Sequence, residues 1–81
     1  MIDEAQIVKD VKKFIETNIT AGGFLIEPTT VLSDAGIDSF SIVEIILFIE
    51  RKYGVSIPNE DMLPENFRTI EAVANTVKKY L

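Results

Sequence analysis

The sequence predicts an all-α fold, a small helical bundle of three main helices and one short helix. Apolar residues recur at helical spacing in three segments, 2–19, 39–53 and 69–81. The runs 31–32 and 55–57 could adopt an extended β conformation, but they are too short to make a sheet. A chain of 81 residues has room for one hydrophobic core. We therefore expect a single domain that covers residues 1–81.

Composition narrows the classes of function. The chain has 47% hydrophobic and 26% charged residues, which is typical of a globular domain. Its net charge of -5 would repel nucleic-acid phosphates, so we expect no nucleic-acid partner. The chain has no cysteine and no histidine, which removes disulfides, thiolate ligands and the commonest general base. Self-contained catalysis is therefore not expected, and neither is a metal site.

No apolar run approaches the length needed to span a bilayer, and the acidic start of the chain at Asp3 and Glu4 does not fit the basic start of a secretion signal. A cytoplasmic monomer without a membrane span is the expectation.

The first expected helix covers residues 2–19. Its acids Asp3 and Glu4 suit the positive end of the helix dipole. Three lysines, at positions 9, 12 and 13, fall on the side away from the apolar stripe and read as a solvated face. The residues expected to be buried are Ile7, Val8, Val11, Phe14, Ile15 and Ile19.

A long connection of roughly 19 residues follows, from Thr20 to Asp38. The pair Gly22 and Gly23 lacks the lysine and spacing of a phosphate-binding loop, so it is interpreted as a helix stop. A calcium loop starting at Asp34 is excluded, because its twelfth position would be Ile45 and not an acid. The side chains available to pack beneath the connection are Phe24, Leu25, Ile26, Val31, Leu32 and Ile37.

The helix expected from residue 39 to residue 53 has Asp38 as its N-cap and Ser39 as its first residue. One apolar stripe of this helix faces the core and consists of Ile42, Ile45, Ile46, Ile49 and Tyr53. A second stripe, Phe40, Val43 and Leu47, lies on a different side. Because 81 residues leave little for a second core layer, this second stripe is expected to face a partner.

The C-terminal third begins with Gly54, a glycine suited to end a helix in the left-handed conformation. The expected short helix covers residues 58–63, contributes Met62 and Leu63 to the core and stops at Pro64. Thr69 can cap the last helix. The expected buried stripe of that helix is Ile70, Val73, Ala74, Val77, Tyr80 and Leu81.

The segment Leu32 to Phe40 resembles the signature of the acyl carrier protein family, in which an Asp-Ser-Leu serine holds 4′-phosphopantetheine. The resemblance extends to the helix that follows, to the turn 53–58 and to the segment 67–70. Helix-start chemistry alone leaves Ser39 two roles, a passive serine or an attachment site. The resemblance implies the second role, with Asp38 as the adjacent acid and helix cap.

In the resembled family a separate phosphopantetheinyl transferase takes the group from coenzyme A. The attached arm then carries acyl or aminoacyl groups as thioesters between a loading ligase and downstream synthases or transferases. The resemblance therefore implies a carrier with no catalytic residue of its own. An unmodified adaptor of the same fold, acting only through protein contacts, is the alternative.

By position, Val43, Glu44 and Leu47 resemble the partner-facing residues of the family's recognition helix. Phe40 stands where the family has leucine. Carriers of fatty acid biosynthesis are strongly acidic along this helix, whereas here the only acids are Glu44 and the glutamate at position 50, followed by two cations at positions 51 and 52. This departure favours a discrete carrier for a specialised pathway, such as one that makes a polyketide, handles an aminoacyl cargo or modifies a lipid.

Overall fold

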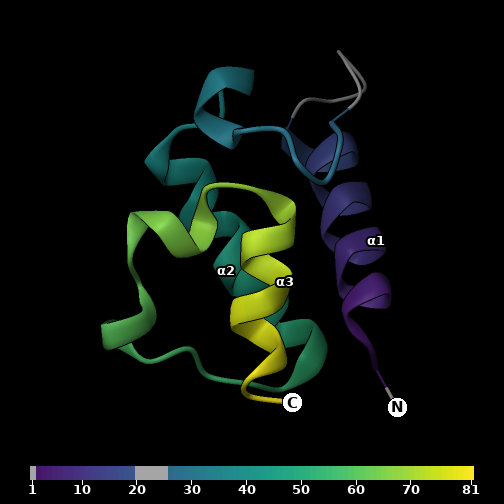
Figure 1. Ribbon diagram of the computed structural model, residues 1–81, viewed down its shortest axis with the longest axis vertical. Helices are drawn as coiled ribbons and strands as arrows, with labels where there is room; N and C mark the ends of the chain where they lie inside the picture. The colour runs from purple at the N-terminus through teal and green to yellow at the C-terminus, as the bar shows by residue number, and fades with distance from the viewer. Residues whose placement is uncertain (1, 20–25) are drawn as a thin grey trace.

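The structure is a computed structural model that describes residues 2–19 and 26–81. Its three α-helices are α1 (Glu4–Phe14), α2 (Ser39–Tyr53) and α3 (Ile70–Lys78). A π-helical turn, η1 (Ile15–Ile19), continues α1, and three 3-10 turns are η2 (Leu32–Ala35), η3 (Asn59–Asp61) and η4 (Pro64–Phe67). No strand occurs in these two described stretches. The predicted all-α fold is confirmed, and Figure 1 shows the three helices packed side by side.

Each α-helix begins at a side-chain cap. Asp3, Asp38 and Thr69 accept a hydrogen bond from the backbone N–H three residues later, at 2.9, 2.9 and 3.0 Å. These bonds satisfy amides that have no partner within the helix. Gly54 ends α2 with φ of 68°, a left-handed conformation that favours glycine. The caps predicted at Asp38 and Thr69 and the stop at Gly54 are confirmed.

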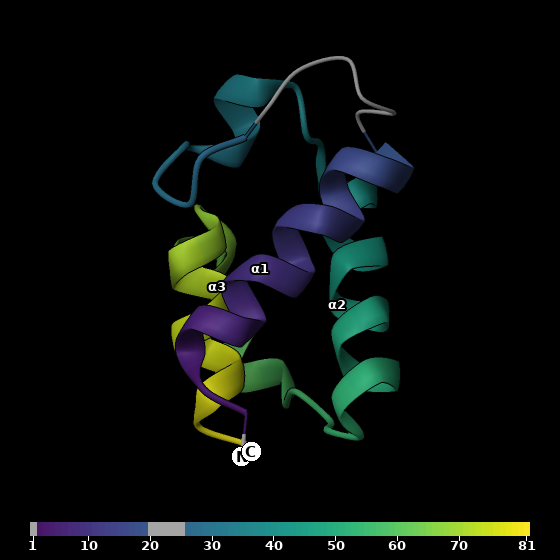
Figure 2. The same cartoon turned by 90° about the vertical axis from the view of Figure 1, so that its right-hand side faces the viewer.

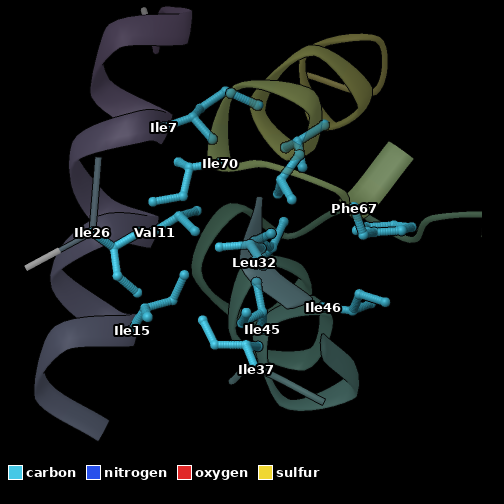
Figure 3. Close-up of a cluster of buried hydrophobic side chains, with 14 of the residues drawn as sticks. Ile7, Val11, Ile15, Ile26, Leu32, Ile37, Ile45, Ile46, Phe67 and Ile70 are labelled. Carbon is cyan, nitrogen blue, oxygen red and sulfur yellow. The ribbon is translucent and has the colours of Figure 1, made fainter. Parts of the chain in front are cut away.

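The core is one cluster of apolar side chains between the three helices, as Figure 3 shows. Ala74 is fully buried, and its small side chain suits the close packing of α1 on α3. The buried apolar residues are Ile7, Val11, Ile15, Ile26, Leu32, Ile37, Ile45, Ile46, Ile49, Ile57, Phe67, Ile70, Val73, Ala74 and Val77. Ile42 and Tyr53, also predicted to face inward, are half-buried against this cluster.

Three details of the C-terminal third differ from the sequence prediction. Leu81 is exposed because α3 ends at Lys78 and the chain leaves the core face. Leu63 is also exposed, although Met62 packs against the core as predicted. Pro64 does not merely stop the preceding turn, since it begins η4, where its missing N–H costs no helix bond. The expected short helix at 58–63 is therefore the 3-10 turn η3 (Asn59–Asp61), and a further turn that was not expected, η4, follows it.

The connection before α2 is tied to the beginning of α3. The N–H of Leu32 donates to the carbonyl of Arg68 at 2.8 Å, and the N–H of Glu71 donates to the carbonyl of Pro28 at 3.1 Å. Figures 1 and 2 show this connection lying across the end of the bundle where α2 and α3 begin. The predicted helix stop at residues 22–23 and the side chains at 24 and 25 lie outside the described residues.

Candidate functional site

Ser39 is the first residue of α2 and is exposed. Exposure alone does not distinguish it, because Ser33 and Ser56 are exposed as well. Its position does, since the free amides and the dipole of a helix N-terminus favour a negatively charged group there. A phosphate ester on Ser39 would therefore lie at the electrostatically favourable end of a 15-residue helix.

Two buried side chains fix the segment that leads to Ser39. Leu32 and Ile37 are 1% and 4% exposed, and the N–H of Ile37 donates to the carbonyl of Leu32 at 3.1 Å. Between them Gly36 has φ of 81°, where a residue with a side chain would be strained. The chain is thus anchored immediately before Asp38 and emerges into solvent there. The anchored segment from Leu32 to Ile37 therefore places Ser39 at the surface.

Asp38 holds the start of α2 in place. Its Oδ1 accepts the hydrogen bond from the backbone N–H of Ser41 at 2.9 Å, and this bond lowers the pKa of the Asp38 carboxyl below its usual value of 3.8. Because the ionised form is favoured in the folded state, its stabilisation is fully present above pH 3.8 and is lost as the pH falls through the lowered pKa.

Asp38→Asn is expected to reduce the acid sensitivity of the fold. Asparagine also caps helices well but does not titrate. The melting temperature of the wild type should exceed that of the variant near pH 6, and this difference should shrink as the pH falls below the ordinary carboxyl range. Thermal melts of both proteins between pH 2 and pH 6 measure this, and a constant difference would contradict the assigned role of Asp38.

An open groove of about 790 Å³ begins at Ser39 and is here called the attachment groove. It lies between the start of α2, η2 and the segment 62–68, which contains η4. Its apolar lining includes Ile42, Val43, Ile46, Met62, Leu63, Pro64 and Phe67, and its polar lining includes Asp34, Asp38, Glu65 and Arg68. Sequence reasoning placed Leu63 in the core and missed this groove, because no helical periodicity links Leu63 to α2.

The second apolar stripe of α2 is on the surface, as predicted. Phe40, Val43 and Leu47 are 74%, 53% and 44% exposed, while Ile45 on the opposite side of the helix is fully buried. Glu44 is exposed beside them. We call Phe40, Val43 and Leu47 the outer stripe. A run of exposed apolar side chains on one helix is typical of a binding surface.

The sequence profile described as "Phosphopantetheine attachment site" matches residues 7–77 of the chain. The chain belongs to the acyl carrier protein family. The prosthetic group of this family is covalently attached 4′-phosphopantetheine, and its members are carriers and not enzymes. Both statements agree with what the resemblance implied.

Named relatives of this carrier include aminoacyl and acyl carriers. It is 32% identical over 76 residues to Aminoacyl carrier protein 1 of Bradyrhizobium diazoefficiens, covering 94% of this chain and 82% of the relative. It is 30% identical over 73 residues to the acyl carrier protein of Campylobacter lari, covering 89% and 92%. It also superposes, with a TM-score of 0.71 and 29% identity, on the carrier protein crystallised with the glycine:[carrier protein] ligase of Bradyrhizobium japonicum, covering 94% and 96%.

The residues at the start of α2 are suited to hold 4′-phosphopantetheine. An exposed serine hydroxyl, a helix N-terminus suited to a phosphodiester and an adjoining groove are all present there. Within residues 2–19 and 26–81 no cluster of three or more acids could hold a metal ion. None of the helices described is long and apolar enough to cross a membrane.

Proposed function

We propose that Ser39 is the residue of this carrier that holds 4′-phosphopantetheine, and that the arm carries aminoacyl groups in a specialised pathway. The observation that supports the site is the exposed position of Ser39 at the N-terminus of α2, directly after the buried anchors Leu32 and Ile37. The similarity to an aminoacyl carrier and to a carrier bound to a glycine ligase supports the cargo.

Ser39 acts as a substrate in this proposal. A serine hydroxyl is a weak nucleophile without a base, and the chain has no histidine. A phosphopantetheinyl transferase would therefore supply the base and join Ser39 Oγ to the phosphate of the arm, with the nucleotide part of coenzyme A leaving. Asp38 caps the helix start beside Ser39 by accepting the hydrogen bond from the backbone N–H of Ser41. When attached, the arm supplies the terminal thiol that this cysteine-free chain lacks.

The cargo can be tested with a defined pair of loading enzymes. The phosphopantetheinylated protein is incubated with ATP and either glycine and the Bradyrhizobium glycine ligase or a fatty acid and a fatty-acyl ligase. The aminoacyl proposal predicts a higher kcat/KM for glycine loading. A higher value for the fatty acid would contradict it and favour a general acyl carrier, of which the Campylobacter relative is an example.

The outer stripe is proposed as the surface to which partner enzymes bind, with Glu44 at its edge. Phe40 is its most exposed member at 74% and is not part of the buried core cluster. Its position beside Ser39 places it where an enzyme reaching the arm must approach. The adaptor alternative would use the same stripe without an arm.

Phe40→Ala is expected to lower kcat/KM for loading by the glycine ligase about tenfold or more, since exposed aromatic side chains at the centre of interfaces often dominate binding. Phe40→Leu is the matched control, because it restores an apolar residue of the type the family has there, and it should retain most of the activity. Both variants should melt at the wild-type temperature. Equal kcat/KM for Phe40→Ala and wild type would contradict the proposed surface.

A further inference from the structure

A second groove lies away from Ser39, between the end of α1 and the outer side of α2. It has a volume of about 520 Å³, and we call it the α1–α2 groove. Figure 2 shows α1 leaning toward α2 at its C-terminal end. The lining residues are Phe14, Glu44, Leu47, Phe48, Arg51 and Lys52. The rings of Phe14 and Phe48 stack with centroids 4.3 Å apart, so a pair of aromatic rings in contact lines the groove.

The lining of the α1–α2 groove has more basic than acidic side chains. Arg51 and Lys52 are exposed, and the ion pairs of the described residues all involve other side chains. The neighbouring carboxylate of Glu50 is engaged, because it accepts a hydrogen bond from the N–H of Ile57 at 2.9 Å. Glu44 is the only acid in the lining. Two cations therefore face one acid here, on a chain whose net charge is -5.

Cations in the last turn of a helix have a structural use, since they interact favourably with the helix dipole. That use explains the charge of Arg51 and Lys52 but not the apolar groove beside them. The π-helical turn η1 begins directly after Phe14. Such turns are rare in proteins, and those that occur are often found at functional sites. The groove also adjoins the outer stripe, because Leu47 belongs to both.

We propose that the α1–α2 groove binds an acidic segment of the partner enzyme that docks on the outer stripe. An apolar side chain of this segment covers Phe14 and Phe48, and its carboxylates pair with Arg51 and Lys52. Arginine suits this role because its planar group can hold a carboxylate through two hydrogen bonds. The inference rests on the proposed function insofar as it takes the outer stripe to be a partner surface.

The test uses two synthetic helical peptides that share a leucine stripe and differ only in having glutamate or lysine beside it. Titration of the ¹⁵N-labelled full chain should show that the glutamate peptide shifts the amide signals of residues 14 and 47–52, and that the lysine peptide does not. Arg51→Gln/Lys52→Gln should weaken binding of the glutamate peptide about tenfold or more. Arg51→Glu/Lys52→Glu should reverse the preference, which loss of structure could not produce.

Four results would overturn the inference, and three of them concern the affinity of the peptides. These are equal binding of the two peptides, equal affinity of the wild type and the glutamine variant, or no signal change at about 1 mM glutamate peptide. Shifts confined to residues 39–43 would also place the acidic segment elsewhere and overturn it. The wild-type sample is tested separately for modification by a phosphopantetheinyl transferase. Absence of modification would contradict the proposed function, while the peptide titration tests binding in the groove independently.

Discussion

Ile45→Ala is expected to lower the free energy of unfolding by about 2 to 5 kcal/mol. Ile45 is fully buried on the inner side of α2 and lies among the side chains of Figure 3. Its truncation removes buried apolar surface and leaves a cavity that a close-packed core fills only in part. Because domains of this kind are stable by about 5 to 15 kcal/mol in total, the loss is a large fraction of the whole.

Urea denaturation followed by circular dichroism measures this loss. Val43→Ala is the matched control on the same helix, since Val43 is 53% exposed and its truncation should cost within about 0.5 kcal/mol. A loss below about 1 kcal/mol for Ile45→Ala, or a similar loss for the two variants, would mean that the inner and outer sides of α2 are wrongly assigned.

Ser39→Ala is expected to abolish phosphopantetheine attachment completely while leaving the free energy of unfolding within about 0.5 kcal/mol of the wild type. The side chain is exposed, and the cap of α2 is supplied by Asp38 and not by Ser39. Alanine is also a good helix former. The variant therefore removes the hydroxyl and little else.

The intact mass after incubation with coenzyme A and a broad-specificity transferase reports attachment. Ser33→Ala and Ser41→Ala are the controls, because they remove the other serine hydroxyls near the start of α2 and should both remain substrates. If Ser39→Ala still gained mass, the attachment residue would be another one. If Ser39→Ala unfolded, the serine would have a structural role that the proposal does not include.

The features that could be predicted from the sequence are those with a strong local cause. Periodicity located the three helices, and the capping chemistry of Asp38, Thr69 and Gly54 set three of their ends. The division of α2 into an inner and an outer side followed from its two apolar stripes, because burial depends on which side of the helix a residue occupies.

Other features could not be predicted from helical periodicity. Leu63 was predicted to be a core residue beside Met62. It is exposed, because η4 begins at Pro64 and changes the direction of the chain. Leu81 continues the stripe of the last helix, yet the helix has already ended at Lys78. Both grooves are likewise formed by side chains from separate elements, which no single periodic pattern connects.

The most direct test of the proposed function is to locate the attached group on the wild-type protein. The protein is modified with coenzyme A and a transferase that is active on a known carrier, digested, and sequenced by tandem mass spectrometry. The proposed function predicts one 4′-phosphopantetheine per chain, on the peptide that contains Ser39 and on that residue. An unmodified protein, or a group on any other residue, would contradict it.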